Sequence, residues 1–128
     1  MALNLNNVML GSADSKKLAE FYAKVLGDAN PDWSDDANGW FGWQIGNGTL
    51  AIGPHSEIEG KSKEPARVML TFETNDVKGE FDRIKDLGAE VVAEPYEPGG
   101  GPGMQLCTLA DPDGNYFQLS TPMTPESS

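Results

Sequence analysis

A few side chains in this sequence have the type and position needed for proton-transfer chemistry. Glu73 ends a run of strand-forming residues and is a candidate general base if its carboxylate is withdrawn from water. Tyr116 begins another such run and carries a phenol that can donate or accept a hydrogen bond. The alternative for Glu73 is a rim residue that pairs with water or with Arg67. The residues therefore permit an enzyme without naming its reaction.

The other reactive side-chain types occur once each. Cys107 stands in a strand-like run with no histidine near it, so we expect a small buried hydrophobe rather than a nucleophile. A single cysteine also excludes an internal disulfide. His55, the only histidine, follows a strand-like run and is expected to be a solvated loop residue.

Aromatic side chains offer a different chemistry, that of ligand stacking. Trp40, Phe41 and Trp43 place aromatic surface on both faces of one predicted strand. Either Trp40 or Trp43 is a candidate wall for a planar or cationic ligand, and packing in a core or a dimer is the alternative for each. The alternation does not say which indole faces a ligand.

The charge of the chain limits its partners. Twenty acidic against nine basic residues give a formal net charge of -11. This charge disfavours nucleic-acid backbones, which require clustered Lys and Arg. It favours cationic small molecules, although solubility alone also accounts for it.

The elements that position these residues follow from hydrophobic periodicity. Leu5, Val8 and Leu10 predict a first strand to about Ser12, and a helix follows from the N-cap Asp14 to the stop at Gly27. A short irregular strand is expected around Trp33. Two further strands, Trp40 to Ile45 and Thr49 to Pro54, form a hairpin across residues 46–48.

The same order recurs after a polar linker at residues 55–65. Ala66 to Glu73 is predicted as a strand, and Val77, Phe81, Ile84 and Leu87 mark one face of a helix. Three strands complete the repeat: Glu90 to Tyr96, Met104 to Ala110 and Tyr116 to Ser120. The glycine-rich residues 98–103 form either a mobile lid or a simple hairpin connection. The tail, residues 122–128, is expected to be disordered.

At 128 residues the sequence predicts a single domain, 1–128, with an α+β fold. Module one covers about residues 3–54 and module two about residues 66–121. No apolar run is long enough to span a membrane, and the first residues lack the features of a signal peptide. With one cysteine and no targeting signal, we expect a cytoplasmic protein.

The chain resembles the vicinal oxygen chelate superfamily, which includes glyoxalase I, extradiol dioxygenases and bleomycin-resistance proteins. The resemblance rests on Asn7-Val8-x-Leu10-x-x-x-Asp14, on Phe21-Tyr22-x-x-x-Leu26-Gly27 and above all on the turn Asp111-Pro112-Asp113-Gly114-Asn115 before the last strand. It implies two tandem βαβββ modules whose mixed sheet curls into a cup, with the helices on the outer face, often completed in a homodimer.

The resemblance also implies where a divalent metal would lie. Family enzymes use His or Gln from the opening strand of each module and Glu from a closing strand. The matching positions here are Asn7 and Met69, with Gln118 and a residue near Ala51. Neutral amides, a thioether and a methyl group are poor ligands for such an ion. We therefore expect a metal-free site and no cofactor.

Two function classes remain open, with a third behind them. The first is a metal-free small-molecule binder like the bleomycin-resistance proteins, with a cationic or aromatic ligand. The second is a lyase, isomerase or hydrolase that uses Glu73, Tyr116 or a recruited metal; the third is an interaction subunit without a ligand. The predicted ligand-binding residues, from the strand faces and their aromatic neighbours, are Asn7, Met9, Trp40, Trp43, Arg67, Met69, Thr71, Glu73, Met104, Tyr116 and Gln118.

Overall fold

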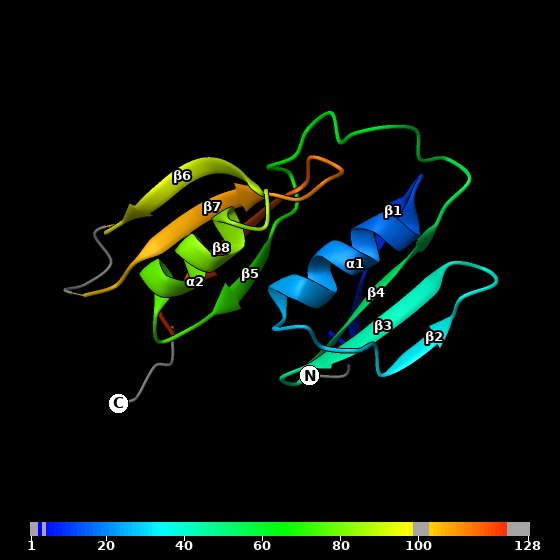
Figure 1. Ribbon diagram of the computed structural model, residues 1–128, viewed down its shortest axis with the longest axis horizontal. Coiled ribbons are helices and arrows are strands. Elements are labelled where there is room, and N and C mark those ends of the chain that lie inside the picture. The colour runs from blue at the N-terminus through cyan, green and yellow to red at the C-terminus, as the bar shows by residue number, and fades with distance from the viewer. Residues whose placement is uncertain (1–2, 4, 99–102, 123–128) are drawn as a thin grey trace. The chain divides into compact units, whose positions relative to one another are not determined.

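The chain folds as two compact units, Met1–Gly60 and Lys61–Ser128, each with one sheet and one helix (Figure 1). The computed structural model describes residues 3, 5–98 and 103–122. Most of the glycine-rich loop at 98–103 and of the tail at 122–128 lies outside these residues, as do most of the first four. Neither helix of the described part is long and apolar enough to cross a membrane.

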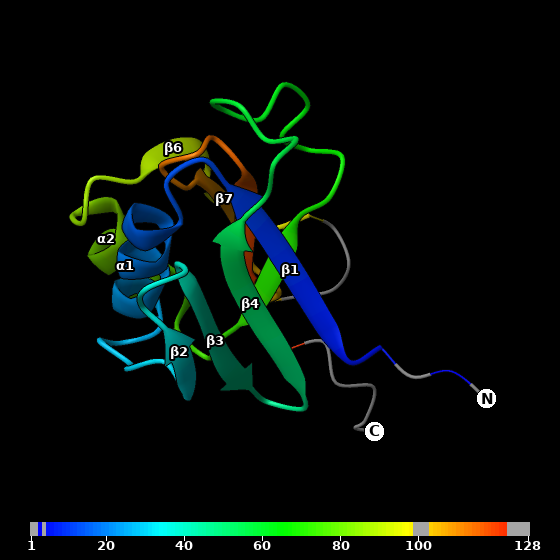
Figure 2. The same cartoon turned by 90° about the vertical axis from the view of Figure 1, so that its right-hand side faces the viewer.

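Unit 1 is a four-stranded mixed sheet with a helix on one face. Its elements are β1 (Asn7–Ser12), α1 (Ser15–Val25), β2 (Trp33–Asp35), β3 (Trp40–Ile45) and β4 (Gly48–Pro54). The strand order is β1-β4-β3-β2, as Figure 2 shows. Strand β1 runs parallel to β4, and the other pairs are antiparallel. A parallel neighbour requires a crossover, and α1 provides it.

Unit 2 repeats this arrangement. Its elements are β5 (Leu70–Glu73), α2 (Val77–Lys85), β6 (Glu90–Tyr96), β7 (Leu106–Ala110) and β8 (Tyr116–Ser120). The order β5-β8-β7-β6, with β5 parallel to β8, matches that of unit 1 position by position. The predicted α+β fold of two tandem βαβββ modules is therefore confirmed.

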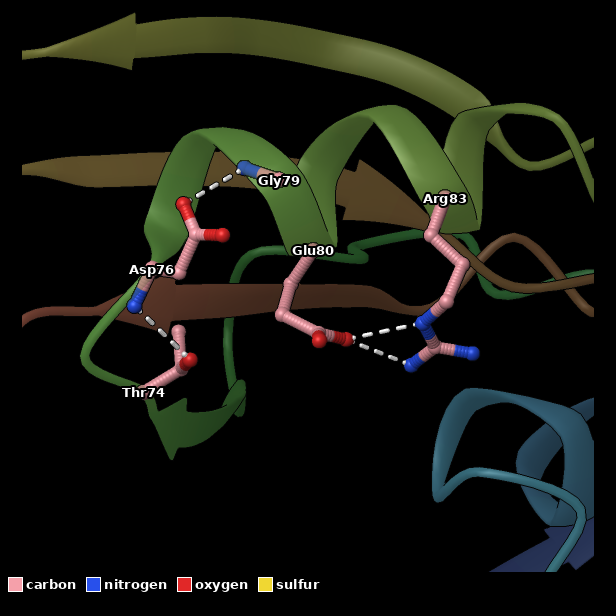
Figure 3. A network of polar contacts seen from close by, with 5 residues as sticks. All are labelled: Thr74, Asp76, Gly79, Glu80 and Arg83. Atoms are coloured by element: carbon pink, nitrogen blue, oxygen red, sulfur yellow. Dashed lines mark hydrogen bonds and ion pairs between the residues drawn. The ribbon is translucent and has the colours of Figure 1, made fainter.

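Both helices begin with the same capping motif, a hydroxyl residue two positions before an Asp. Ser12 Oγ accepts a hydrogen bond from the Asp14 N–H at 3.0 Å, and Asp14 Oδ1 accepts one from the Lys17 N–H at 3.2 Å. In unit 2, Thr74 Oγ1 accepts a hydrogen bond from the Asp76 N–H at 3.1 Å, and Asp76 Oδ1 accepts one from the Gly79 N–H at 3.0 Å (Figure 3). These bonds satisfy amide groups that a helix start leaves without partners.

Each helix buries its apolar stripe against the sheet of its own unit. In unit 1, Leu18 and Tyr22 of α1 are almost fully buried, as are Leu50 and Ile52 of β4. In unit 2 the helix contributes Phe81 and Ile84, and the sheet side consists of Cys107, Leu109, Phe117 and Leu119. Because burying a side chain of this size stabilises a fold by about 1.5–3 kcal/mol, these layers hold each unit together.

The turn predicted before the last strand is present, and the Asp111 carboxylate holds it together. Asp111 is buried and accepts hydrogen bonds from the N–H groups of Asp113 at 2.9 Å and Asn115 at 3.0 Å. Its second oxygen accepts a bond from Asn115 Nδ2 at 3.0 Å. The turn therefore fixes the direction in which the chain enters β8.

Several predicted element bounds were wrong. Strand β1 begins at Asn7, which leaves Leu5 exposed, and helix α2 ends at Lys85, which leaves Leu87 outside it. Strand β7 begins at Leu106 rather than Met104. The largest error concerns β5, because residues 66–69 do not belong to it. The Arg67 N–H bonds to the Glu64 carbonyl in a turn instead, so Val68 is 71% exposed rather than packed on a helix.

Candidate functional site

The candidate site begins with the side of each sheet that faces away from its own helix, here called the open face. Directly opposed residues on neighbouring strands share a face, and so do alternate residues along a strand. The register pairs Met9 with Ala51, Ala51 with Gly42, and Gly42 with Trp33. The open face of unit 1 therefore comprises Asn7, Met9, Gly11, Trp33, Asp35, Trp40, Gly42, Gln44, Thr49, Ala51 and Gly53.

Two tryptophans lie over two glycines on this face. A Cβ atom added at Gly42 would stand 2.1 Å from Cε2 of Trp33, and one added at Gly53 would stand 2.2 Å from Cε3 of Trp40. Separations that short do not occur, so each indole lies directly on a backbone that must lack a side chain. We call Trp33, Trp40, Gly42 and Gly53 the indole platform. Trp33 keeps 46% of its surface exposed and Trp40 is half-buried.

Trp43 lies on the opposite side of the same strand. It pairs with Leu50, is 2% exposed and donates a hydrogen bond from Nε1 to the carbonyl of Ala29 at 3.0 Å. A buried indole with its one donor satisfied is a core residue. Of the two tryptophans that the sequence could not separate, Trp40 therefore belongs to the open face and Trp43 to the helix side.

The indole platform has the acidic residue Asp35 beside it on β2, and the segment after β4 beside it on the β1 side. Asp35 stands directly opposite Trp40 in the register, on the same face. Its two oxygens accept hydrogen bonds from the N–H of Asn38 at 3.3 Å and from Asn38 Nδ2 at 2.8 Å. On the far strand, a Cβ atom at Gly11 would lie 3.2 Å from His55 Cβ and from Ile58 Cγ1, so residues after β4 fold against this end.

The open face of unit 2 carries neutral hydrogen-bonding groups where unit 1 carries indoles. Thr71 Oγ1 donates to Gln118 Oε1 at 3.1 Å, and Gln118 Nε2 donates to Thr108 Oγ1 at 3.5 Å. The three residues form one row across β5, β8 and β7, which we call the amide row. The Gln118 amide is thus bonded at both ends, as acceptor from one threonine hydroxyl and as donor to the other. Of the predicted residues, Thr71 and Gln118 are thus brought together.

The two candidate catalytic residues differ in setting. Glu73 is exposed at the end of β5, where its backbone pairs in the register with Ser120, and its carboxylate makes no hydrogen bond or ion pair with the described residues. Tyr116 is half-buried at the start of β8, where its N–H donates to the carbonyl of Pro65 at 3.4 Å. Ser120, the register partner of Glu73, is 1% exposed.

The remaining predicted residues lie outside the strands. Arg67 is exposed and forms an ion pair with Glu64, three residues before it, rather than with Glu73. Met69 precedes β5, and Met104 precedes β7. They therefore lie outside the strand alternation that suggested them.

The donor set does not fit the metal that the resemblance implies. Ala51 and Gln118 occupy equivalent positions in the two modules. Ala51 of β4 pairs with Met9 of β1, and Gln118 of β8 pairs with Thr71 of β5. Neither they nor Asn7 and Met69 supply an imidazole or a carboxylate. In the described residues, moreover, no three His, Cys, Asp or Glu side chains come together in a way that could hold a metal ion.

Trp33 is the residue that the sequence reasoning missed. It was placed in a short irregular strand without a role at a site. The available signal was Gly42, because a glycine inside a strand marks a point where another group approaches the backbone closely. The approaching group here is the Trp33 indole.

Comparison with known proteins places this geometry in a family. Residues 7–120 match the model of the glyoxalase-like domain. No curated protein sequence matches the chain. Among solved structures, a glyoxalase-related enzyme from Fulvimarina pelagi is 18% identical with a TM-score of 0.75, covering 93% of this chain and 88% of that one. A glyoxalase/bleomycin resistance protein/dioxygenase family enzyme from Burkholderia phytofirmans is 19% identical with a TM-score of 0.70, covering 93% and 98%.

A third structure has a somewhat higher identity. A hypothetical protein from S. aureus is 26% identical to this chain with a TM-score of 0.61, and the match covers 95% of this chain and 98% of that one. The first two likenesses establish the fold alone, since their identities are low.

Proposed function

Because the chain belongs to the glyoxalase-like domain family of the vicinal oxygen chelate superfamily, we propose that it binds a small organic molecule without a metal and without changing it chemically. The ligand is aromatic or cationic. The indole platform carries this proposal, since Trp33 and Trp40 present flat aromatic surface on the open face of unit 1. Such surfaces bind planar rings and cations through their π faces.

The donor chemistry supports the absence of a metal. At the positions where family enzymes place their ligands, this chain has Asn7, Ala51, Met69 and Gln118. An ion there would exchange its water shell for neutral amides, a thioether and a methyl group, which do not offset its charge. In unit 2 the amide of Gln118 is already bonded to Thr71.

The alternative is an enzyme of the same superfamily that uses Glu73, Tyr116 or a recruited metal. A general base works best when burial or a neighbouring charge brings its pKa near the working pH. Glu73 is exposed and has no ion-pair partner among the described residues, so no contact favours this role. Binding without turnover is therefore the better-supported function.

The test is a titration of tryptophan fluorescence with a planar probe, N-methylacridinium. We expect saturable quenching, and mass spectrometry is expected to recover the probe unchanged. Trp40→Leu should weaken binding by about tenfold, since stacking on one indole contributes on the order of 1 kcal/mol or more. Leu87→Ala, an exposed apolar residue outside the strands, should leave binding unchanged. A chemically altered product that forms in the wild type and disappears in Glu73→Gln would overturn the proposal.

Three broader predictions accompany this function. We propose that the protein is one domain, that it forms a homodimer and that it is cytoplasmic. Light scattering of the purified protein tests the dimer, because a monomer mass at all concentrations would contradict it. Cell fractionation tests the location.

A further inference from the structure

The distribution of charge around the indole platform is strongly one-sided. Residues 26–60, which include three of the four strands of unit 1, contain no Lys or Arg. They contain six acidic residues, Asp28, Asp32, Asp35, Asp36, Glu57 and Glu59. The lysines of unit 1 are Lys16, Lys17 and Lys24, and all three lie on α1. The lysines of unit 1 are thus confined to α1, where Glu20 and the cap Asp14 also lie, whereas residues 26–60 carry acidic groups without any Lys or Arg.

From this geometry we propose that the ligand is a planar organic cation, which lies on the indoles of Trp33 and Trp40 while Asp35 serves as its counter-charge. The inference rests on the proposed function, because it names the chemical class that the same site selects. A neutral aromatic ligand is the alternative that the experiment must separate from it.

The register places the charge and the aromatic surface together. Asp35 and Trp33 are alternate residues of β2 and share a face, and Asp35 stands directly opposite Trp40 of β3. The Cβ atoms of directly opposed residues lie about 4.5–5.5 Å apart. A ligand on the Trp40 ring is therefore within reach of the Asp35 carboxylate.

The two indoles lie close enough to act on one ligand. Gly42 pairs with Ala51, so Gly53 is its diagonal neighbour on the adjacent strand. Diagonal neighbours lie about 7–8 Å apart. A fused-ring ligand that covers Trp33 therefore also reaches Trp40, and a positive charge delocalised over its rings interacts with both π faces.

The Asp35 carboxylate is held in position and can still accept further hydrogen bonds. Asn38 bonds to both of its oxygens, which fixes the orientation of the group. An ionised carboxylate has about four acceptor positions, so two remain for a ligand. The nearby Asp32 precedes β2 and accepts a hydrogen bond from the Gln44 N–H at 2.6 Å. Asp35, unlike Asp32, is a strand residue that the register places on the open face.

The experiment compares two probes of matched shape, N-methylacridinium and acridine, at a pH where acridine is neutral. Calorimetric titration of the full chain is expected to give about five- to tenfold tighter binding of the cation, the combined effect of a cation–π contact and an exposed ion pair. This preference should shrink as salt is added. Equal binding of both probes at low salt would overturn the cation inference and leave the proposed binding function standing, whereas no binding of either would overturn both.

Two variants assign the preference to a residue. Asp35→Asn should bring the affinity for N-methylacridinium down to that for acridine while leaving acridine binding unchanged. Asp36→Asn removes the same charge one position along, in the turn after β2, and should keep most of the preference. Equal loss in both variants would show a diffuse field and remove Asp35 as the counter-charge. Near-ultraviolet circular dichroism checks that Asp35→Asn keeps the wild-type tryptophan signals despite its altered contact with Asn38.

Discussion

Among single residues, Gly42 and Gly53 determine where aromatic surface lies on the open face of unit 1. A ring laid flat on a strand needs a position without a Cβ atom, and each glycine meets an indole at a separation that no side chain would permit. The same feature separates the two indoles of β3: Trp40 lies over Gly53, whereas Trp43 packs beside Leu50 on the helix side. The identity of the site thus depends on residues that contribute no chemistry themselves.

Gly53→Ala is expected to displace the Trp40 ring. The added methyl would overlap the indole, and overpacking of this kind costs about 1–3 kcal/mol of unfolding free energy. Probe binding should weaken with it, because the platform loses its flat arrangement. Urea denaturation followed by far-ultraviolet circular dichroism measures the first effect and fluorescence titration the second.

Gly48→Ala in the same strand is the matched control. A Cβ atom there would meet only the Ile45 carbonyl oxygen, at 3.9 Å, which is ordinary contact. Its stability should therefore stay within about 0.5 kcal/mol of the wild type. Similar losses in both variants would mean that any side chain in β4 is harmful and that the indole contact is not the cause.

Cys107 gives a pH-dependent prediction. Burial raises the pKa of this thiol above its ordinary value of 9.0, and a backbone hydrogen bond from Leu119 partly opposes the rise. The folded state then keeps its proton at a pH where the unfolded state has lost it. The thiol's contribution to the unfolding free energy is fully present below pH 9.0. Above pH 9.0 this contribution falls by up to about 1.4 kcal/mol per pH unit until the folded thiol also ionises. Cys107→Ala should show a shallower decline in unfolding free energy over this range, and equal slopes would contradict the assignment.

The sequence predicted the facing of residues within strands better than the facing of residues beside them. It supplied Thr71 and Gln118, which the structure joins by a hydrogen bond, because strict alternation holds within a well-paired strand. It placed Arg67 and Met69 on the same face by extending that alternation into residues that form a turn. It left Trp33 without a role, since Gly42 indicates a close approach to the backbone but only the pairing of β2 with β3 shows that the approaching group is Trp33.

Among the elements, the helix starts were the most predictable features. Asp14 was expected as a cap and acts as such, and Asp76 caps the second helix in the same way, each two positions after a hydroxyl residue that accepts a hydrogen bond from the Asp N–H. A cap is decided by neighbouring residues alone, so it is visible in the sequence. Strand starts are decided by distant partners, and β5 begins four residues later than expected, at Leu70, because Pro65 and Arg67 bond elsewhere.

Asp76→Ala is expected to destabilise the protein by about 1 kcal/mol, since the Gly79 N–H then loses its acceptor at the start of α2. Asp82→Ala is the matched control on the same helix. Among the described residues, its carboxylate pairs with exposed Lys78 at 3.4 Å, a contact that contributes less than about 0.5 kcal/mol. Chemical denaturation of both variants measures the difference, and an equal cost would show that the cap bond contributes nothing beyond loss of the aspartate.

For the whole molecule, one backbone plan carries two different surfaces. The βαβββ order, the strand register and the helix caps repeat from unit 1 to unit 2. The open faces do not repeat, because unit 1 presents indoles with an acidic edge and unit 2 presents the neutral amide row. The fold was predictable because buried apolar positions repeat with it. The class of the proposed ligand was not, because it depends on open-face positions that differ between the two units.

Thermal unfolding of the full chain separates the proposed ligand from a metal. A molecule that binds only the folded state stabilises it by about 2.7 kcal/mol at a concentration about a hundredfold above its dissociation constant. N-methylacridinium should therefore raise the melting temperature in a concentration-dependent way. Zinc or manganese ions should leave it unchanged, because Asn7, Ala51, Met69 and Gln118 supply no imidazole or carboxylate. A rise with metal that a chelator reverses, and that Gln118→Ala abolishes, would show that the neutral positions do bind an ion and would overturn the metal-free assignment.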